Sequence, residues 1–377
     1  MRIAIVATNY AEYAANLALA LSASNEVMLV LSRRNARREL RPQSIKFLRE
    51  KVSLHIVPHH YAPLQPIVAG LCWRLVARFR PDVVHVQEHP TRATYWLARL
   101  LKGAHPLVTT VHDPIAHSGA DTASASIFAR YHRGLRLLSD RIIVHGNSLV
   151  SDFSDLLPNG AQRVRSVPHG VLRFGLFKLE PEAAISTEDR FIFFGRMNKY
   201  KGLDVLLDAN EIWLEKGLRP SLIVAGTGPE IVRLRDRLRL APNIELLPRW
   251  VSQPELEALL RQCAASILPY RDATQSGAAA SSLGAGRPVI ATNVGALSEV
   301  IRAGENGLLV PPGDAQSLAD ASAKFLSDPE LRKHVTEGAR RTAGSVLGWT
   351  GIASLTEQIY QEAWLAHKAK DSPQPAG

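Results

Sequence analysis

The sequence predicts an α/β fold made of two parallel-sheet domains in tandem. Three observations support this prediction: the chain has 377 residues, apolar runs of strand type alternate with helical patterns, and the alternation is lost once near the middle. Apolar residues make up 46% of the chain and charged residues 21%, which is typical of a globular protein and excludes a disordered chain.

The first half of the chain alternates strand and helix. The branched apolar runs Arg2 to Ala7 and Glu26 to Leu31 flank a helical stretch, Tyr10 to Leu21, and the three together indicate a βαβ unit. Further strands are expected at 53–57, 83–86, 107–111, 142–145 and 164–167, with helices at 66–79 and 92–101. Because these strands are apolar along their length, they indicate a parallel sheet with helices on both faces.

The second half repeats this pattern after a break. The periodicity is lost between Gly170 and Asp189, where we expect the linker between the domains. Strands are then expected at 191–194, 221–225, 244–246, 265–268, 289–291 and 307–310, with helices at 203–214 and 230–240. A helix at 349–369 precedes the polar tail 370–377, which we expect to be disordered. Ligands in such folds bind at the carboxyl ends of the strands, so a cleft between the domains is the expected site.

Charge and cysteine content narrow the class of protein. The only two cysteines, Cys72 and Cys263, exclude a disulfide framework and fit a cytoplasmic protein. No membrane-spanning helix is expected, because charged residues interrupt every long apolar run. Lys and Arg number 45 against 35 Asp and Glu, and the net charge of +10 favours an anionic partner. Nucleic acid is not the expected partner, since no groove-reading motif or aromatic stacking platform is evident.

The densest basic block lies near the N-terminus. It comprises Arg33, Arg34, Arg37, Arg38 and Arg41. On a helix and loop these side chains can face anionic headgroups, so one interpretation is a peripheral position on the inner face of the membrane. The other interpretation is a solvated protein surface.

A pair of cations follows the first strand of the second half. The run from Phe191 is an apolar strand that ends at Gly195, and Arg196 and Lys201 follow before the next helix. An arginine can bind two phosphate oxygens while a lysine supplies a compact charge, a combination that suits a diphosphate. A surface loop with incidental basic residues fits the same pattern.

Two turns after other strands are also candidates for ligand binding. One leads into an alanine-rich helix whose first backbone amides can bind an anion, and it is formed by Thr274, Gln275, Ser276 and Gly277. The other contains Gly226 and Gly228, on which a nucleoside could rest. It lacks the third glycine of a dinucleotide-binding motif, and a tight turn from strand to helix explains it equally well.

A histidine and an aspartate stand at a strand end of the first half. His112 and Asp113 follow an apolar strand directly, and His117 comes soon after. Such positions carry catalytic or substrate-binding side chains in parallel α/β folds. The small and polar residues 116–126 predict a loop over an acceptor site, and His85, within an apolar strand, predicts a core position. No histidine pair at helical spacing indicates a metal site, so no bound metal is expected.

Several ordered motifs resemble glycosyltransferase family 4. In the second half the matching stretches are 194–207, 224–229, 286–299 and 306–314. In the first half 81–87, 111–113 and 167–170 match more loosely, and 349–360 resembles the returning terminal helix of the family. The resemblance implies a GT-B architecture, in which two Rossmann-like domains face a cleft. It implies an acceptor-binding domain of residues 1–172 plus helix 349–369, and a nucleotide-sugar-binding domain of residues 186–348.

The resemblance implies a retaining, metal-independent transfer of a sugar from a nucleotide-sugar to a glycan or lipid-linked acceptor, with a role in cell-surface polysaccharide biosynthesis. No cofactor is implied beyond the donor, whose UDP or GDP type stays open. Arg196 and Lys201 match the positions that hold the diphosphate, and His112 matches the position that contacts the donor sugar. The other donor-binding candidates are Gly195, Gly226, Gly228, Arg249, Val251, Thr274, Gln275, Ser276 and Gly277, and the acceptor candidates are Asp113 and His117.

The sequence departs from the family at two positions. The family usually carries a glutamate at each end of the donor loop, and these positions hold Ala273 and Ser281. Hydroxyl, amide and main-chain groups of 274–277 can replace the carboxylates, or activity is weakened or lost. Two alternative hypotheses stay open. The same two-domain fold also hosts nucleotide-sugar epimerases, although these need acid/base carboxylates and the two missing glutamates argue against one, and a non-catalytic nucleotide-sugar-binding protein is the other alternative.

Overall fold

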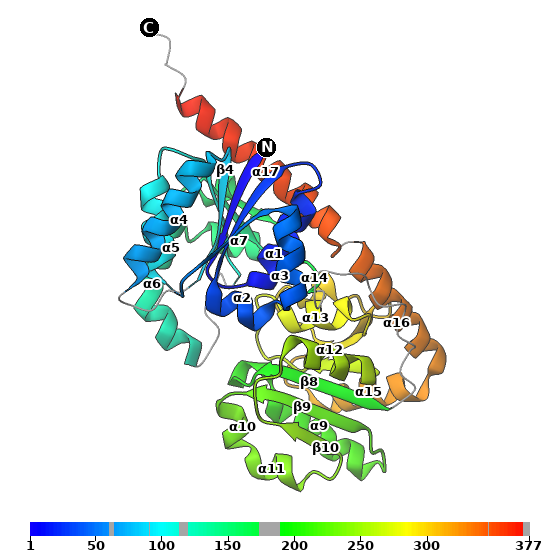
Figure 1. The fold of residues 1–377 in the computed structure, drawn as a ribbon. Coiled ribbons are helices and arrows are strands. Elements are labelled where there is room, and N and C mark those ends of the chain that lie inside the picture. The colour runs from blue at the N-terminus through cyan, green and yellow to red at the C-terminus, as the bar shows by residue number, and fades with distance from the viewer. Residues whose placement is uncertain (60–63, 90, 113–119, 173–188, 346, 372–377) are drawn as a thin grey trace. The chain divides into compact units, whose positions relative to one another are not determined.

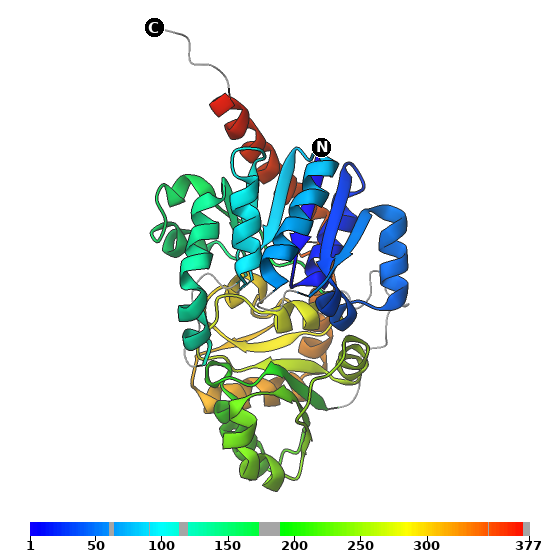
Figure 2. The same cartoon turned by 60° about the vertical axis from the view of Figure 1, so that its left-hand side comes forward.

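A computed structural model describes residues 1–59, 64–89, 91–112, 120–172, 189–345 and 347–371 (Figure 1). The chain forms two compact units. Unit 1 comprises Met1–Ile115, Ala123–Pro168 and Trp349–Gly377, and unit 2 comprises Ala116–Thr122 and His169–Gly348. Each unit is built on one parallel sheet with helices packed against it (Figures 1 and 2). The predicted α/β class with two parallel sheets is confirmed.

The sheet of unit 1 has seven strands in the order β3-β2-β1-β4-β5-β6-β7. Its strands are β1 (Arg2–Ala7), β2 (Glu26–Ser32), β3 (Ser53–Val57), β4 (Val83–Gln87), β5 (Leu107–Thr110), β6 (Arg141–Val144) and β7 (Val164–Ser166). Each lies where the apolar runs predict a strand. Strands β2 and β3 are added on one side of β1, and β4 to β7 on the other. The boundary between β1 and β4 is therefore the switch point, where open parallel sheets bind ligands.

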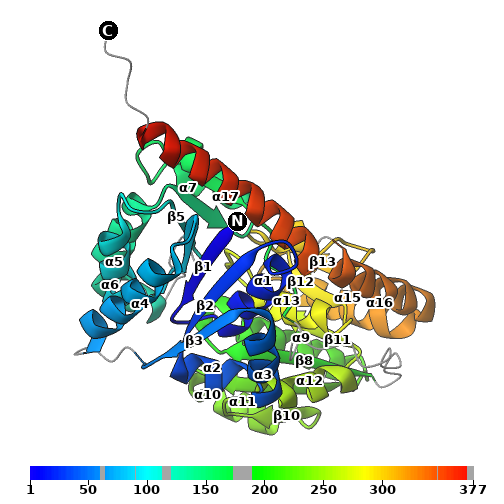
Figure 3. The same ribbon diagram turned by 45° about the horizontal axis from the view of Figure 1, so that its top comes forward.

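Nine helices of the described chain belong wholly or largely to unit 1. They are α1 (Ala11–Leu21), α2 (Arg33–Glu39), α3 (Pro42–Lys51), α4 (Gln65–Phe79), α5 (Arg92–Leu101), α6 (Ala120–Leu138), α7 (Ser148–Ser154), α8 (Gly160–Arg163) and α17 (Trp349–Asp371). The last of these packs against α1, β4 and β5, so unit 1 contains both ends of the described chain (Figure 3). The loop predicted over 116–126 is wrong from Ala120 onward, because the alanine-rich start of α6 has strong helix propensity.

Unit 2 has a six-stranded sheet in the order β10-β9-β8-β11-β12-β13. Its strands are β8 (Arg190–Arg196), β9 (Ser221–Thr227), β10 (Ile244–Leu247), β11 (Ala265–Leu268), β12 (Val289–Thr292) and β13 (Gly307–Val310). Here the order reverses between β8 and β11. The carboxyl ends of these two strands are therefore the place in unit 2 where a ligand is expected.

The helices of unit 2 follow most of its strands. They are the 3-10 turn η2 (Lys199–Lys201), α9 (Leu203–Glu215), α10 (Pro229–Arg233), α11 (Arg235–Leu240), α12 (Gln253–Gln262), α13 (Gly277–Gly284), α14 (Leu297–Val300), α15 (Ala315–Ser327) and α16 (Pro329–Gly344). The single helix predicted over 230–240 is broken at Leu234, whose φ is −105° and ψ is 16°. The break keeps the side chains of Ile231, Leu234 and Leu238 in the core of the unit.

Candidate active site

Lys201 lies at the switch point of unit 2. It ends the 3-10 turn after β8, and only 9% of its surface is exposed. Its Nζ donates a hydrogen bond of 2.6 Å to Oη of Tyr270, which follows β11, and lies 4.3 Å from the centre of the same ring. The hydroxyl and the π face together hold the ammonium in one position. The structure thus places a fixed cation between the two strands that flank the switch point.

Backbone packing fixes the turn that carries Lys201. Gly202 has a φ of +68°, and a Cβ at this position would lie 1.9 Å from the carbonyl oxygen of Pro269 at the end of β11. Gly195, with a φ of +119°, lies on the other side, where a Cβ would be 3.6 Å from Nζ of Lys201. Only glycine accommodates such backbone angles without strain. The two glycines therefore allow the lysine to sit close against both strand ends.

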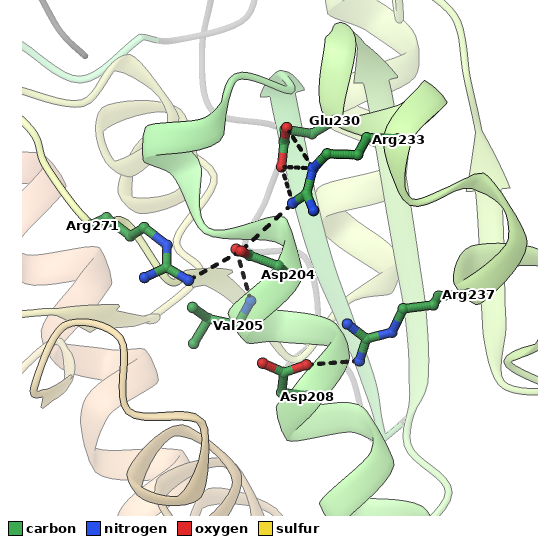
Figure 4. A network of polar contacts seen from close by, with 7 residues as sticks. All are labelled: Asp204, Val205, Asp208, Glu230, Arg233, Arg237 and Arg271. Carbon is green, nitrogen blue, oxygen red and sulfur yellow. Dashed lines mark hydrogen bonds and ion pairs between the residues drawn. The ribbon is translucent and has the colours of Figure 1, made fainter. Parts of the chain in front are cut away.

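A network of ion pairs supports the same turn, and sequence reasoning did not find it (Figure 4). Asp204, in the first turn of α9, accepts a hydrogen bond of 3.0 Å from Nη2 of Arg271 and lies 3.6 Å from Nη2 of Arg233. Arg233 also pairs with Glu230 at 2.5 Å. The network joins the start of α9 to α10 and to the loop after β11. The acidic residue placed in the first turn of a helix was the available signal for it.

The helix start predicted to bind an anion lies beside the lysine site. Oγ of Ser276 caps α13 by accepting a hydrogen bond of 3.2 Å from the backbone N–H of Ala279, and it lies 3.4 Å from Oη of Tyr270. A Cβ at Gly277 would meet no heavy atom within 4 Å, so there is open space at the first residue of the helix. Tyr270 thus connects the ammonium of Lys201 to the start of α13. Burial raises the pKa of Tyr270 to about 12, so its hydroxyl stays protonated at neutral pH.

The other residues of the donor loop, 273–275, are fixed by burial and by a backbone hydrogen bond. Thr274 is buried, and its carbonyl oxygen accepts a hydrogen bond of 3.3 Å from the backbone N–H of Ala296. Oε1 of Gln275 is buried and has no hydrogen-bond partner among the described residues. Ala273 and Ser281 are each 4% exposed. Because these residues are an alanine and a serine, neither position supplies a carboxylate.

The other donor-binding candidates lie at neighbouring strand ends. Arg196 ends β8 on the exposed side and is in register with Thr227 of β9. A Cβ at Gly226 would lie 1.9 Å from the carbonyl oxygen of Gly195, and one at Gly228 would lie 2.5 Å from that of Met197. Close packing of the ends of β8 and β9 accounts for both glycines.

Arg249 and Val251 follow the edge strand β10, which β9 separates from β8. Nη1 of Arg249 donates a hydrogen bond of 2.9 Å to Glu255 on α12, in an exposed ion pair. This pair raises the pKa of the arginine and lowers the pKa of the glutamate. Val251 is half-buried against the apolar cluster beneath α12.

His112 lies two residues after the end of β5, beside the switch point of unit 1. Its side chain is 1% exposed, and its Nε2 lies 2.8 Å from Oε1 of Gln87 at the end of β4. The ring of Tyr10 stacks on it at 3.8 Å between centroids, and the rings of Tyr13 and His145 lie at 5.0 Å. The histidine is therefore enclosed by aromatic rings. Asp113 and His117, the acceptor candidates, lie outside the described residues.

A conformational feature of the loop after β1 helps to enclose His112. Tyr10 has a φ of 59°, one of three positive values among the non-glycine residues of the described chain. The left-handed region disfavours residues with a Cβ, so the stacking on His112 is associated with local strain. Nothing in the sequence pattern around Tyr10 predicted this.

His85 shows the core role that was predicted for it. It is fully buried, with Nδ1 at 2.6 Å from Oη of Tyr360 on α17 and Nε2 at 2.7 Å from Oγ1 of Thr110. Burial lowers the pKa of His85 to about 3, so the imidazole is neutral.

Two family models match the chain. One, described as Glycosyltransferase Family 4, matches residues 11–171, and the other, described as Glycosyl transferases group 1, matches residues 188–328. The chain belongs to these glycosyltransferases. The family resemblance and the enzyme class predicted from the motifs are confirmed.

Three curated relatives of this glycosyltransferase are named for three different activities. A glycogen synthase of Mycobacterium tuberculosis is 26% identical over 309 residues, which are 79% of this chain and 72% of the relative. A D-inositol 3-phosphate glycosyltransferase of Thermobispora bispora is 28% identical over 75% of this chain and 71% of its own. A phosphatidyl-myo-inositol mannosyltransferase of Mycobacterium leprae is 28% identical over 74% of this chain and 73% of its own.

Solved structures of the same fold match nearly the whole glycosyltransferase chain. The catalytic domain of starch synthase IV from Arabidopsis thaliana, bound to ADP and acarbose, has a TM-score of 0.73 at 13% identity and covers 97% of this chain and 99% of its own. Anabaena HepE in complex with UDP has a TM-score of 0.67 at 16% identity and covers 96% and 100%. The predicted GT-B fold is confirmed. Within the described part of the chain, no helix has the length and hydropathy needed to span a membrane.

Proposed function

We propose that this glycosyltransferase transfers a sugar from a nucleoside diphosphate to a glycan or lipid-linked acceptor, with retention of anomeric configuration and without a metal ion. The observation that carries the proposal is the buried ammonium of Lys201, held by Tyr270 beside the open start of α13. A fixed cation next to helix amides matches the charge of a diphosphate. Retention and metal independence are supported by the family resemblance alone.

The chemistry assigned to these residues is charge stabilisation. The bond between C1 of the sugar and the phosphate oxygen breaks, and its electron pair stays on the diphosphate. Lys201 and Arg196 stabilise this charge, while the acceptor hydroxyl bonds to C1 and passes its proton to the departing diphosphate oxygen. Cations that are already in place do not have to reorganise as the charge develops. The complexes of HepE with UDP and of starch synthase IV with ADP support a nucleoside diphosphate as the leaving group.

The experiment is a screen of labelled UDP-, GDP- and ADP-sugars with glycan and lipid acceptors, followed by NMR of the anomeric proton of the product. Lys201→Ala is expected to lower kcat/KM by about 100-fold to 1,000-fold, as for the loss of one group that stabilises developing charge. Unchanged turnover of Lys201→Ala would refute the assignment. Binding of the donor without transfer or hydrolysis would favour a non-catalytic protein. This alternative is specific because Ala273 and Ser281 stand where the family usually carries glutamates.

Metal independence needs its own test, because His112 and His145 place two imidazoles side by side and imidazole is a common metal ligand. Activity is expected to survive dialysis against EDTA and to show no gain with Mg²⁺, Mn²⁺ or Zn²⁺. The proposal would be contradicted if activity were lost on dialysis and recovered when Zn²⁺ or Mn²⁺ was added back.

We also propose that helix α2 binds an anionic membrane surface, which would bring the enzyme to a lipid-linked acceptor in cell-surface polysaccharide biosynthesis. Four arginines are exposed on one side of α2, opposite the buried Asn35 and Ala36, and they are Arg33, Arg34, Arg37 and Arg38. Arg41, which precedes α3, is half-buried and contributes less to this face. The relative named as a phosphatidyl-myo-inositol mannosyltransferase supports a lipid acceptor.

Sedimentation with vesicles tests the membrane proposal. Each cation near an anionic surface contributes about 1 kcal/mol, so replacing all four arginines of α2 by Gln should weaken binding on the order of 1,000-fold at low salt. The control replaces four exposed cations of unit 2 by Gln and should bind nearly as the unmodified protein does; they are Arg235, Arg239, Lys333 and Arg341. Equal loss in both variants would show a response to net charge and not a binding face.

A further inference from the structure

A continuous chain of buried polar side chains runs from the terminal helix α17 to His112. Oη of Tyr360 lies 2.6 Å from Nδ1 of His85, whose Nε2 lies 3.3 Å from Nε2 of Gln87. Oε1 of Gln87 then lies 2.8 Å from Nε2 of His112. All four side chains are at most 1% exposed. Each contact is therefore protected from exchange with water.

With the amide of Gln87 oriented as in the structure, the four groups have one consistent set of proton positions. An amide oxygen only accepts hydrogen bonds, so Nε2 of His112 carries the proton and donates to Gln87. The amide nitrogen of Gln87 only donates, so Nε2 of His85 accepts from it, and Oγ1 of Thr110 can donate to the same nitrogen. Nδ1 of His85 then carries the proton and donates to Tyr360. In the neutral imidazole of His112, Nδ1 is left as the acceptor.

The position of these four hydrogen-bonded side chains in the sheet distinguishes them from ordinary core packing. Gln87 is the last residue of β4 and His112 comes two residues after the end of β5, so both lie at the carboxyl edge of the sheet, beside the switch point. Buried amides and imidazoles pack no better than apolar side chains and are costly if any partner is missing. A complete polar chain that ends at the one histidine assigned to the sugar therefore indicates control over that histidine.

We propose that Gln87 is a positioning residue that holds His112 as its Nε2–H tautomer, with Nδ1 presented as a hydrogen-bond acceptor, and that Tyr360 fixes the other end of the chain through His85. The inference rests on the proposed function, which assigns His112 to the donor sugar. It adds a chemical restriction to that assignment. His112 accepts a hydrogen bond from a hydroxyl group and does not donate one to a phosphate oxygen.

The test is long-range ¹H–¹⁵N NMR of the imidazoles in the full chain, which reads the tautomer of each histidine without any need for activity. The unmodified protein should show His112 as Nε2–H. In Gln87→Leu the signal should become a mixture of tautomers, and kcat/KM should fall by about 10-fold to 100-fold, as expected when a reacting group is slightly misplaced. Gln87→Glu should convert His112 toward imidazolium and shift its titration midpoint upward, because a carboxylate stabilises the charged ring.

The titratable groups of unit 1 whose rings pack against His112 include Tyr10, Tyr13 and His145, so the pH series is also recorded for Tyr13→Phe. The matched control for Gln87 is Gln65→Leu. Gln65 is also a buried glutamine of unit 1, and its Oε1 accepts a hydrogen bond of 2.9 Å from the backbone N–H of Arg92. Gln65→Leu should leave the His112 tautomer unchanged, and melting curves establish that each variant folds.

An Nδ1–H tautomer of His112 in the unmodified protein would overturn the proposal, and so would a Gln87→Leu variant with unchanged tautomer and turnover. Tyr360→Phe should disturb the tautomer in the same direction as Gln87→Leu but less strongly, since two members of the chain remain between it and His112. Full activity of His112→Ala would instead refute the assignment of His112 to the reaction. It would leave the NMR result intact, so the two failures are distinguishable.

Discussion

Replacing Tyr270 by Phe removes one atom from the site and leaves the rest of the ring in place. The lost atom is the hydroxyl oxygen 2.6 Å from Nζ of Lys201, while the aromatic face 4.3 Å from the ammonium remains. A hydrogen bond to a charged group contributes about 1.5–3 kcal/mol. At about 1.4 kcal/mol for each factor of ten, kcat/KM for the donor should fall by about 10-fold to 100-fold.

The assay compares kcat and KM for the donor in Tyr270→Phe, Lys201→Ala and Tyr200→Phe. Tyr200 is a suitable control because its ring is also close to the ammonium, at 5.7 Å, and is also buried. The loss should be largest for Lys201→Ala, intermediate for Tyr270→Phe and smallest for Tyr200→Phe. The reasoning fails if Tyr270→Phe matches the unmodified enzyme, or if the two tyrosine variants lose the same activity with unchanged melting temperatures.

Two further predictions concern stability. The pKa of His85 is about 3 in the folded chain and about 6.5 when unfolded, so the folded state binds fewer protons and loses stability as pH falls below 6.5. At pH 5 the loss is about 2 kcal/mol, and urea midpoints that do not change between pH 7.5 and pH 5 would contradict this. Gly202→Ala places a Cβ against the carbonyl oxygen of Pro269 and should lower stability by about 2 kcal/mol more than Gly217→Ala, which has a similar φ of +73° and open space around it. Equal melting temperatures of the two glycine variants would argue against the close contact.

The alternation of strands and helices was predictable because fully buried parallel strands are apolar along their whole length, as Val83–Gln87 and Val289–Thr292 illustrate. The start of α6 was not, since its alanines and serines have the composition of a loop as well as that of a helix. The break at Leu234 depends on packing in the core, and a helical pattern of apolar residues does not encode it.

In the candidate site, too, some residues have a local sequence signal and others depend on contacts between distant segments. Lys201 was found from sequence because a cation after a buried strand is a local signal. Tyr270, which holds it, is 69 residues away and resembles an ordinary core aromatic. The same holds for Gln87 and Tyr360, whose relation to His112 exists only once the sheet and α17 have formed. Contacts between distant segments carry no local pattern, so the supporting side chains are the part that sequence reasoning misses.

The return of the chain to its first unit has a consequence for biosynthesis. Residues 1–168 leave the ribosome long before Trp349–Asp371, and the intervening stretch of about 180 residues takes on the order of ten to forty seconds to translate. During that time the nascent first unit lacks Tyr360 and the helix that covers α1. Truncation before Trp349 should therefore leave this unit prone to aggregation and proteolysis, while the second unit, made entirely before that point, can complete its own sheet unaided.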